Sequence, residues 1–577
     1  MDVSTSTRIS EYVDLTRQGS EAFWVRLKKW FIVTGGVGLI VGLAVALLEM
    51  AVMAIWDRII PMINPVTVVL APTIGLALSG LILQYTTVNP EVHGTEEVIE
   101  AFHERGGVFR FRSFPGKVMA AIATVGFGGS AGLEGPSIYL GGAIGSFVLR
   151  KIRRFGFTDD DVRTLMIAGA AAGVSAVFKA PLTGIVFALE VPYRDDLTRE
   201  ALIPSLIASV SSYLVLVQFL GVEPLFLVSE RYTFGTRDLL FSIAIGLMVG
   251  LLARAFVVSF HGFSALARRM PVPLWVRTAT GGLLTGLFGL AALKLFGEPV
   301  VLGTGYSAID GLVTGAYTTP DAVWLLVLKA GAVIATLASG AAGGIFIPMI
   351  MLGATSGVIV RGVLPGAVGP MFPVVGMAAF LAAGYSTPIA ATVFIAETTG
   401  GAGYIIPGLV AAAVAFTVAG KTSVSDKQRW RRETRLDRMM GARVGTIMTP
   451  DVITLRSTES LLTFVTERMV HLRHKSMPVV DEDGALVGMV GLFDVDPIPK
   501  EDWARLTIED VMSKEVLTVT RSTLIGELVA RMAERDIDRV PVVDADDPTA
   551  LLGIVSTTDV MAMDDMTADW RRKAHAQ

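Results

Sequence analysis

Two short segments combine glycine, an apolar stretch and proline in a way that suits anion binding. Residues 132–136 read Gly-Leu-Glu-Gly-Pro and residues 344–348 read Gly-Ile-Phe-Ile-Pro, each within a long apolar part of the chain. A glycine-rich turn that leads into proline favours a helix start with proline at the first helical position. The free N–H groups and the positive end of the helix dipole then favour an anion. The segments predict two anion-binding helix starts, with the carboxylate of Glu134 at one of them.

Acidic side chains are scarce in the other apolar stretches, where Glu49, Glu190 and Glu397 are the remaining examples. A cation pathway would need several acids that converge inside the membrane. Glu190 and Glu397 close two similar segments, 181–190 and 388–397, and fixing a helix end suffices to explain them. The scarcity of acids therefore favours anions over cations.

The chain is strongly apolar, and its charges are unevenly placed. Of its 577 residues, 52% are hydrophobic and only 18% are charged, whereas ordinary soluble domains carry about 25% charged residues. The 157 residues from 421 onward contain 49 charged side chains, about 31%, whereas the first 420 contain 53, about 13%. This distribution predicts a membrane domain followed by a soluble one.

The same composition excludes several classes of function. Without cysteine the chain has no disulfides, thiolate metal sites or cysteine nucleophiles, and its six histidines disfavour a zinc enzyme. The net charge of −4 gives no sign of a nucleic-acid partner. We therefore expect a protein that is not an enzyme, with no resident metal and no required cofactor.

The apolar part is interrupted and duplicated. Between residues 330 and 420 only Arg361 and Glu397 are charged, yet glycine and proline break the run, so interrupted helices are expected. Lipid cannot satisfy the backbone groups that a break frees, so each break must face protein or a wet cavity. The Pro-to-Glu segments recur at an offset of 207 and the breaks at 212, which predicts repeats over about 25–220 and 235–420 with an ion site at their interface.

These segments resemble the motifs of the CLC family of chloride channels and transporters. Residues 132–136 are similar to its Gly-Arg/Lys-Glu-Gly-Pro motif, and residues 344–348 to its Gly-x-Phe-x-Pro motif. The Pro-to-Glu repeats and residues 301–306 also fit, so the resemblance covers most of 25–440. It implies an all-α polytopic membrane domain with inverted repeats and broken helices. It also implies a homodimer in the lipid bilayer in which each subunit has its own chloride pathway.

The resemblance implies a role for residues at both breaks. Glu134 would be the gating glutamate, because its ionised carboxylate is a tethered anion that competes with chloride for helix N–H groups, and protonation ends that competition. Leu133 and Gly135 would belong to the same anion-binding segment. The backbone N–H groups of Ile345 and Phe346 would hold a central anion. The alternative is that Glu134 is a buried acid that satisfies loop amides.

The chain departs from the family pattern at the inner end of the pathway. Residues 92–96 align with the motif Gly-Ser-Gly-x-Pro, so His93 stands where a serine contacts the central anion in some members, and Glu96 replaces proline. His93 could equally be a polar loop residue near the membrane surface. Family members often place a tyrosine hydroxyl on this anion from the end of the domain. Ser425 stands near that place and is short for the role, so a wider inner end is expected.

One further departure concerns proton coupling. Exchangers of the family commonly carry a second glutamate, a proton relay, directly after the position that matches Glu190, and this chain has Val191 there. The relay by that route is lost, which favours a passive chloride channel. A proton-coupled chloride antiporter is the alternative, because water or another acid could carry the proton. More distant alternatives are a divalent-cation transporter with similar soluble modules, and a receptor without transport, which would leave the breaks unexplained.

The chain from about residue 442 onward contains a second duplication. Ile-Met-Thr-Pro at 447–450 and Met-Pro-Val-Val at 477–480 recur in kind at 511–514 and 540–543, at offsets of 64 and 63. Strands joined by acidic turns predict hairpins, with amphipathic helices between them. This α+β pattern resembles a tandem pair of CBS modules.

The resemblance to CBS modules implies an adenine nucleotide, ATP or AMP, as a ligand of the tail. The ribose-binding pattern Gly-x-Ile/Val-Ser/Thr-x-x-Asp is met in full by residues 553–559, which include Ser556 and Asp559. The first copy keeps Asp494 but has glycine in place of the hydroxyl. The alternative is that Asp559 only caps the final helix and the pair of modules stabilises the dimer.

Basic residues precede the first apolar run and follow the last one. The positive-inside rule then predicts cytoplasmic N- and C-termini for an integral protein of the plasma (inner) membrane. The expected divisions are a cytoplasmic N-terminal segment, a membrane domain, a basic linker and the two CBS modules, at 1–24, 25–425, 426–441, 442–500 and 506–566.

Overall fold

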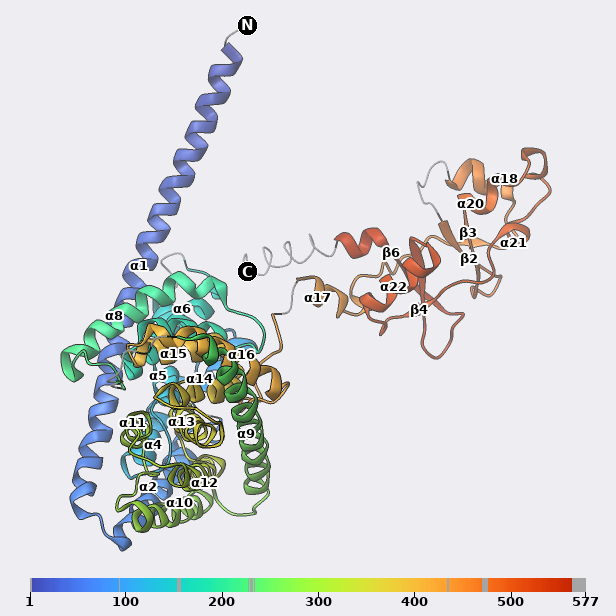
Figure 1. Ribbon diagram of the computed structural model, residues 1–577. Coiled ribbons are helices and arrows are strands. Elements are labelled where there is room, and N and C mark those ends of the chain that lie inside the picture. Colours follow the sequence, from blue (N-terminus) through green and yellow to red (C-terminus); the bar gives the residue numbers. More distant parts are fainter. Residues whose placement is uncertain are drawn as a thin grey trace. The chain divides into compact units, whose positions relative to one another are not determined.

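The computed structural model describes residues 3–92, 94–152, 157–226, 228, 232, 234–432, 435–469 and 476–562. The chain divides into two compact units, Met1–Arg431 and Arg432–Gln577. They are the membrane unit and the C-terminal unit, and each is described by itself (Figure 1).

The membrane unit is all helical, and its two halves contain corresponding helices. Those of the first half are α1 (Val3–Ile59), α2 (Pro65–Thr86), α3 (Thr95–Glu104), α4 (Phe114–Gly126), α5 (Glu134–Ile152), α6 (Asp159–Phe178), α7 (Pro181–Glu190) and α8 (Leu202–Leu220). Those of the second half are α9 (Thr236–Arg268), α10 (Leu274–Phe296), α11 (Tyr306–Thr314), α12 (Thr319–Ala338), α13 (Phe346–Val363), α14 (Met371–Tyr385), α15 (Pro388–Thr398) and α16 (Ile405–Ala419). Short 3-10 turns precede or follow some of them, at Ile60–Met62, Phe111–Ser113, Arg199–Ala201 and Ala402–Tyr404.

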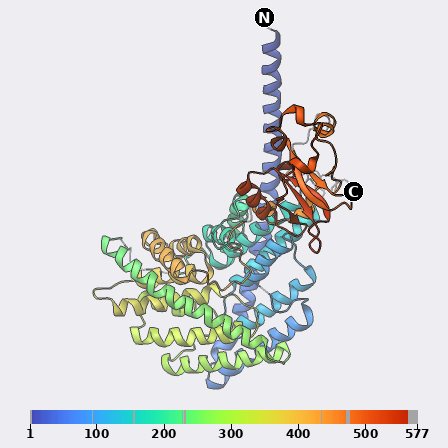
Figure 2. The ribbon, with the colours of Figure 1, turned by 90° about the vertical axis from the view of Figure 1, so that its right-hand side faces the viewer.

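Packing repeats between the halves. Helix α5 packs on α6 and α6 on α8, as α13 packs on α14 and α14 on α16. Helix α1 packs on α8 as α9 packs on α16, and α2 packs on α10 across the two halves. In Figure 2, α9, α10 and α12 lie side by side, in agreement with their contacts. The expected duplication is confirmed at the level of individual helix pairs.

Broken helices are present, as the glycine and proline pattern predicted. Nine helices of the described chain are long and apolar enough to cross a membrane, whereas α7, α14 and α15 are shorter apolar helices. A ten-residue helix such as α7 is about 15 Å long, half the thickness of the hydrocarbon core. Both α7 and α15 begin at a proline, which directly follows the N-cap residue. The residue before each N-cap is left-handed: Lys179 (φ 52°) before α7 and Ser386 (φ 56°) before α15.

The C-terminal unit contains two similar three-stranded sheets. Its helices are α17 (Arg435–Met440), α18 (Leu461–Thr463), the π-helical turn Phe464–Met469, α20 (Leu492–Val495), α21 (Ile508–Val511) and α22 (Ile525–Arg535), with 3-10 turns at Val444–Thr446 and Lys500–Asp502. Its strands are β1 (Leu455–Arg456), β2 (Ser476–Val480), β3 (Leu486–Gly491), β4 (Val519–Thr520), β5 (Arg539–Val543) and β6 (Leu551–Ser556). In each sheet the first two strands are parallel and the last two form the predicted antiparallel hairpin.

In each module, the segment that precedes the sheet pairs with the sheet of the other module. Thr449 pairs with Ile554 of β6, although Thr449 precedes the first sheet in sequence. Ser513 pairs with Met489 of β3, although Ser513 precedes the second sheet. Two backbone hydrogen bonds of 2.9 Å hold Thr449 to Ile554, and bonds of 3.0 and 2.9 Å hold Met489 to Ser513. Each sheet is therefore completed by a segment from the other copy.

Candidate functional site

The two glycine-rich breaks meet each other inside the membrane unit. The backbone N–H of Gly132 donates to the carbonyl of Gly344, and that of Gly344 donates to the carbonyl of Gly132, both at 2.8 Å. Gly135 lies against the same loop, where a side-chain carbon would come within 3.0 Å of the Gly344 Cα and 3.1 Å of the Gly343 carbonyl oxygen. Glycine is required at this close approach, and helices α5 and α13 start from one shared junction.

Both helices begin two residues before the proline of their motif. The first intrahelical bonds run from Ser137 N–H to the Leu133 carbonyl and from Met349 N–H to the Ile345 carbonyl. Pro136 and Pro348 thus occupy the third helical position, so the expectation of proline at the first position is wrong. Proline fits here because N–H groups of the first turn have no intrahelical acceptor. The N–H groups of the first two helical residues, 134–135 in α5 and 346–347 in α13, are left free of intrahelical partners.

The carboxylate of Glu134 occupies the start of α13. Glu134 is 1% exposed, and its Oε1 accepts a hydrogen bond from the N–H of Phe346, with the N–H of Ile347 also facing the carboxylate. Its Oε2 is buried and has no hydrogen-bond partner in the described part of the chain. A side chain at Gly132 or Gly344 would overlap this carboxylate. The predicted gating residue and the predicted N–H donor Phe346 are therefore in direct contact.

A buried lysine that the sequence reasoning missed lies near this carboxylate. Lys329 of α12 is fully buried, and its ammonium group donates to the carbonyls of Val301 and Gly303, each at 3.1 Å. Its charge also acts on Glu134. The signal was available, because Lys329 directly precedes the long run in which only two residues are charged.

The rings around Phe346 come from equivalent places in the two repeats. Phe178 and Tyr385 each lie three residues before the proline of α7 or α15, and their ring centroids are 4.7 and 6.4 Å from that of Phe346. Tyr385 is buried and faces Thr95, and the charges of Glu134 and Glu96 act on its hydroxyl. A buried tyrosine at the end of α14 therefore lies beside Phe346, about 40 residues before Ser425.

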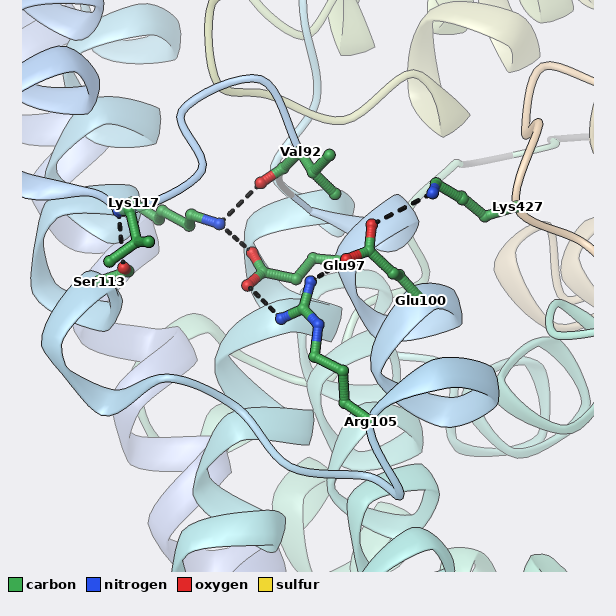
Figure 3. A network of polar contacts seen from close by, with 8 residues as sticks. Val92, Glu97, Glu100, Arg105, Ser113, Lys117 and Lys427 are labelled. Atoms are coloured by element: carbon green, nitrogen blue, oxygen red, sulfur yellow. Dashed lines mark hydrogen bonds and ion pairs between the residues drawn. The ribbon is translucent and has the colours of Figure 1, made fainter.

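Ion pairs and hydrogen bonds hold the segment 92–96, which aligns with the family motif Gly-Ser-Gly-x-Pro (Figure 3). His93 lies outside the described residues. Beside it, Lys117 of α4 donates to the Val92 carbonyl at 2.7 Å and forms an ion pair with Glu97 of α3. Glu97 and Lys117 are 3% and 4% exposed, so this pair is buried. The network fixes the loop before α3 and hence the start of that helix.

The same network reaches the end of the membrane unit. Glu100 of α3 pairs with Arg105 and, at 3.4 Å, with the ammonium group of Lys427 (Figure 3). Ser425 is fully buried, and its Oγ has no hydrogen-bond partner by geometry within the described chain, although it faces Glu96. The structure therefore places Ser425 beside the start of α3.

Val191 lies at the end of α7 and is fully buried. Its N–H donates to the Phe187 carbonyl at 2.8 Å, and its carbonyl accepts from Nε2 of Gln428 at 2.9 Å. Gln428 also donates to the Tyr385 carbonyl at 2.9 Å. Val191 is thus an apolar residue whose side chain packs in the hydrophobic core and whose backbone is hydrogen-bonded.

Two cavities lie against the junction of the breaks. One has a volume of about 720 Å³ and is lined by Leu133, Glu49 and residues 302–307 at the start of α11. The other has a volume of about 220 Å³ and is lined by residues 343–345, Tyr385 and the start of α3. The starts of α3 and α11, which are repeat equivalents, thus face different cavities. We call the first the outer cavity and the second the inner cavity, after the orientation that the basic flanking residues predict. Residues 424, 426 and 427 also line the inner cavity.

A family model described as voltage gated chloride channel matches residues 74–420, and a CBS domain model matches 444–496 and 508–564. The chain belongs to the voltage-gated chloride channel family. The ClC-type chloride channel ClcB of Escherichia coli O9:H4 (strain HS) is 30% identical over 380 residues, which is 62% of this chain and 85% of that protein. Anion transport by the membrane unit and a C-terminal pair of CBS domains follow from the family.

Solved CLC structures have the same fold. A CLC-type fluoride/proton antiporter superposes with a TM-score of 0.61 at 23% identity, covering 71% of this chain and 99% of the other. A eukaryotic CLC transporter superposes with a TM-score of 0.59 at 17% identity, covering 92% of this chain and 98% of the other. The expected all-α CLC-like membrane domain followed by an α+β CBS pair is therefore confirmed.

In the CBS pair of this CLC protein the three predicted nucleotide-binding residues cap helices. Oδ2 of Asp559 accepts from the N–H of Ser556 at 2.8 Å and from its hydroxyl at 2.6 Å. Oδ2 of Asp494 accepts from the Gly491 N–H at 2.7 Å, and its Oδ1 accepts from the Ser513 hydroxyl at 2.9 Å. Capping of the two helix starts therefore accounts for both aspartates without a ligand.

Proposed function

We propose that the protein is a chloride channel in which each chain has one anion pathway, and that Glu134 gates this pathway. The observation that carries the proposal is the position of the Glu134 carboxylate on the Phe346 N–H. A carboxylate there occupies a donor that a chloride ion would otherwise use, and Ile345 and Leu133 line the cavities on either side of it. Protonation would remove the charge and release the donor.

Passive conduction, and not exchange, is supported by Val191. The side chain at this position cannot bind a proton and is buried in the hydrophobic core. ClcB of Escherichia coli also bears the name of a chloride channel.

The second candidate function is proton-coupled chloride antiport, and one observation favours it. Glu96 is an acid in the inner cavity, and the charges of both Glu96 and Glu134 act on Tyr385. An acid on that side could receive protons by a route that avoids Val191.

Further parts of the proposal concern assembly and location. We place both termini in the cytoplasm and the protein in the plasma (inner) membrane, because basic residues flank the apolar part. The inner cavity then faces the cytoplasm. Membership of the CLC family supports a homodimer. The CBS pair would bind ATP or AMP through Ser556, Asp559 and Asp494, and His93 and Ser425 would contribute to the inner end of the pathway.

Flux from liposomes tests the proposal. Purified protein should release chloride down its gradient, and a chloride gradient should not drive protons uphill into a weakly buffered lumen. Proton uptake in a fixed ratio to chloride would establish the antiporter instead. Magnesium uptake without chloride movement would exclude both candidates.

A further inference from the structure

The inner cavity contains an unusual mixture of charges close to the anion site. Besides Tyr385 and the backbone of residues 343–345, its walls contain three cationic side chains, three carboxylates and one histidine: Arg268, Arg277, Lys427, Glu91, Glu96, Asp426 and His261. An ion that moves between the cytoplasm and Phe346 through this cavity must pass these groups. Their net charge therefore matters for anion entry.

Two of the three carboxylates lie beside a basic side chain. Glu91 accepts from the guanidinium of Arg277 at 2.9 Å, and Asp426 lies 3.5 Å from Nδ1 of His261. Within the described chain no ion pair joins Glu96 to a cation. The ammonium of Lys427, whose charge also acts on Glu96, pairs with Glu100 at 3.4 Å and with Glu104 at 3.9 Å. Glu96 is therefore the one lining carboxylate that has no ion-pair partner among the described residues.

The position of Glu96 is fixed by helix α3. It is the second residue of that helix, and the ion pairs of Glu97 and Glu100 on the same helix hold the backbone in place. Its carboxylate faces the hydroxyl of Ser425 and the backbone N–H and ammonium group of Lys427, with the carboxylate of Asp426 also near it. The charges of Glu96 and Glu134 both act on Tyr385, which packs beside Phe346. The two glutamates thus share Tyr385 as a neighbour, and only Glu96 lines the inner cavity.

We propose that Glu96 is a proton-binding residue that controls anion entry at the inner end, so that the protein responds to cytoplasmic pH independently of Glu134. This inference rests on the proposed function, because it presupposes anion flux through the inner cavity. An ionised Glu96 repels an incoming anion and balances the cations of the cavity. A protonated Glu96 leaves the cavity with an excess positive charge that attracts anions.

The environment of Glu96 supports a protonation change near neutral pH. Burial raises its pKa to about 7, Asp426 also raises it, and Ser425 and Lys427 act in the opposite direction. Helix α3 is outside the candidate membrane spans. Anion flux should therefore rise as the cytoplasmic pH falls through about 7. Between pH 8 and pH 6 the protonated fraction changes about tenfold.

The experiment uses full-length protein in chloride-loaded liposomes and begins from Glu134→Gln, which removes the response at the outer end. In the molecules whose inner end faces the bath, any remaining dependence of chloride efflux on bath pH is then attributed to Glu96. Chloride efflux from Glu134→Gln should rise several-fold when the bath is changed from pH 8 to pH 6. In Glu96→Gln/Glu134→Gln this rise should disappear. A double variant that responds like Glu134→Gln, or a Glu134→Gln protein with no response, would overturn the proposal.

Two further variants separate this result from misfolding and from the general charge of the cavity. Glu96→Pro/Glu134→Gln should also be insensitive to bath pH, and proline is tolerated in the first turn of a helix. Glu91→Gln/Glu134→Gln removes the neighbouring, Arg277-paired acid of the same cavity and should keep the several-fold rise. If Glu91→Gln abolishes the rise, Glu96 is not the responsible group. A wild-type protein that moves no chloride would instead refute the proposed function.

Discussion

Glu190 and Glu397 each cap the helix that the other one closes. Glu190, the last residue of α7, accepts hydrogen bonds from the N–H groups of Ile389 and Ala390 at the start of α15, at 3.2 and 2.8 Å. Glu397, in the last turn of α15, accepts from the N–H groups of Leu182 and Thr183 at the start of α7, at 3.0 and 2.8 Å. The two half-length helices are thereby joined by reciprocal charge-assisted bonds across the repeat interface.

These caps predict a loss of stability that is similar at both positions. Glu190→Ala and Glu397→Ala each leave two helix N–H groups without an acceptor, which should cost about 1–2 kcal/mol. Thermal unfolding in detergent should show a lower Tm for both variants, and Glu223→Ala, at an exposed position, should match wild type. An unchanged Tm for either cap variant would contradict a stabilising role for that cap.

Removal of the charge at Glu134 should abolish the response to external pH. Glu134→Gln retains the size of the side chain but can no longer be ionised, so it competes with chloride in the same way at every pH. In membrane patches whose inner face is held at pH 7.5, chloride current through the variant should be the same at external pH 7.5 and 4.5, whereas wild type should carry several-fold more current at the lower pH. A wild-type pH response in Glu134→Gln would remove Glu134 from the gating role.

The glycine at position 344 should be necessary for the closed position of the gate. The methyl group of Gly344→Ala would overlap the Glu134 carboxylate and displace it from the Phe346 N–H. We expect a higher chloride flux at neutral external pH and a weaker dependence on pH than in wild type. Gly262→Ala on α9, where an added methyl group meets no atom within 4 Å, is the matched control. Gating equal to wild type in Gly344→Ala, with a monodisperse protein, would contradict the closed position described above.

The hydroxyl of Tyr385 should contribute to chloride binding at the inner end. Tyr385→Phe keeps the ring beside Phe346 and removes a donor, which is worth about 1 kcal/mol or a several-fold loss of affinity. Chloride titration calorimetry on Glu134→Gln, where the carboxylate does not compete as an anion, measures this loss. Tyr85→Phe changes an exposed hydroxyl on α2 and should have no effect. Equal affinities of the Tyr385→Phe and parent proteins would exclude the role.

The tail offers a test that separates a nucleotide site from simple capping. If ATP or AMP binds the second CBS module, Asp559→Ala should weaken binding to the full-length protein about tenfold or more, or 1.4 kcal/mol. Asp483→Ala, in the exposed turn of the first module, should not. Absence of nucleotide binding by wild type would leave helix capping as the role of Asp559 and Ser556.

Much of the fold and the centre of the site could be predicted from the sequence. The offset of 212 between the breaks indicated two similar helix starts, and the structure brings Glu134 to Phe346 at that offset. The reason is physical, because a duplicated break exposes N–H groups that must find a partner inside the protein. The CBS hairpins followed in the same way from strands and turns.

Other features depend on contacts that a single sequence does not specify. Glu190 and Glu397 could be assigned to helix ends, but the helix that each one caps is set by packing between the halves. Tyr385 could not be linked to the inner end, because it lies about 40 residues before Ser425 and reaches the same region through the end of α14. The exchange of Thr449 and Ser513 between the sheets was equally hidden, since two similar copies can pair with themselves or with each other.

That exchange has a consequence for biosynthesis. On the ribosome, Thr449 emerges about 100 residues before its partner Ile554, so the first CBS copy cannot be completed when its own residues have been translated. The first sheet likewise waits for Ser513, which belongs to the second copy. The tail should therefore mature in one late step after nearly the whole chain has been made. A nonsense mutation between the two copies would deprive the first sheet of Ser513 and leave the 449 segment without its partner strand.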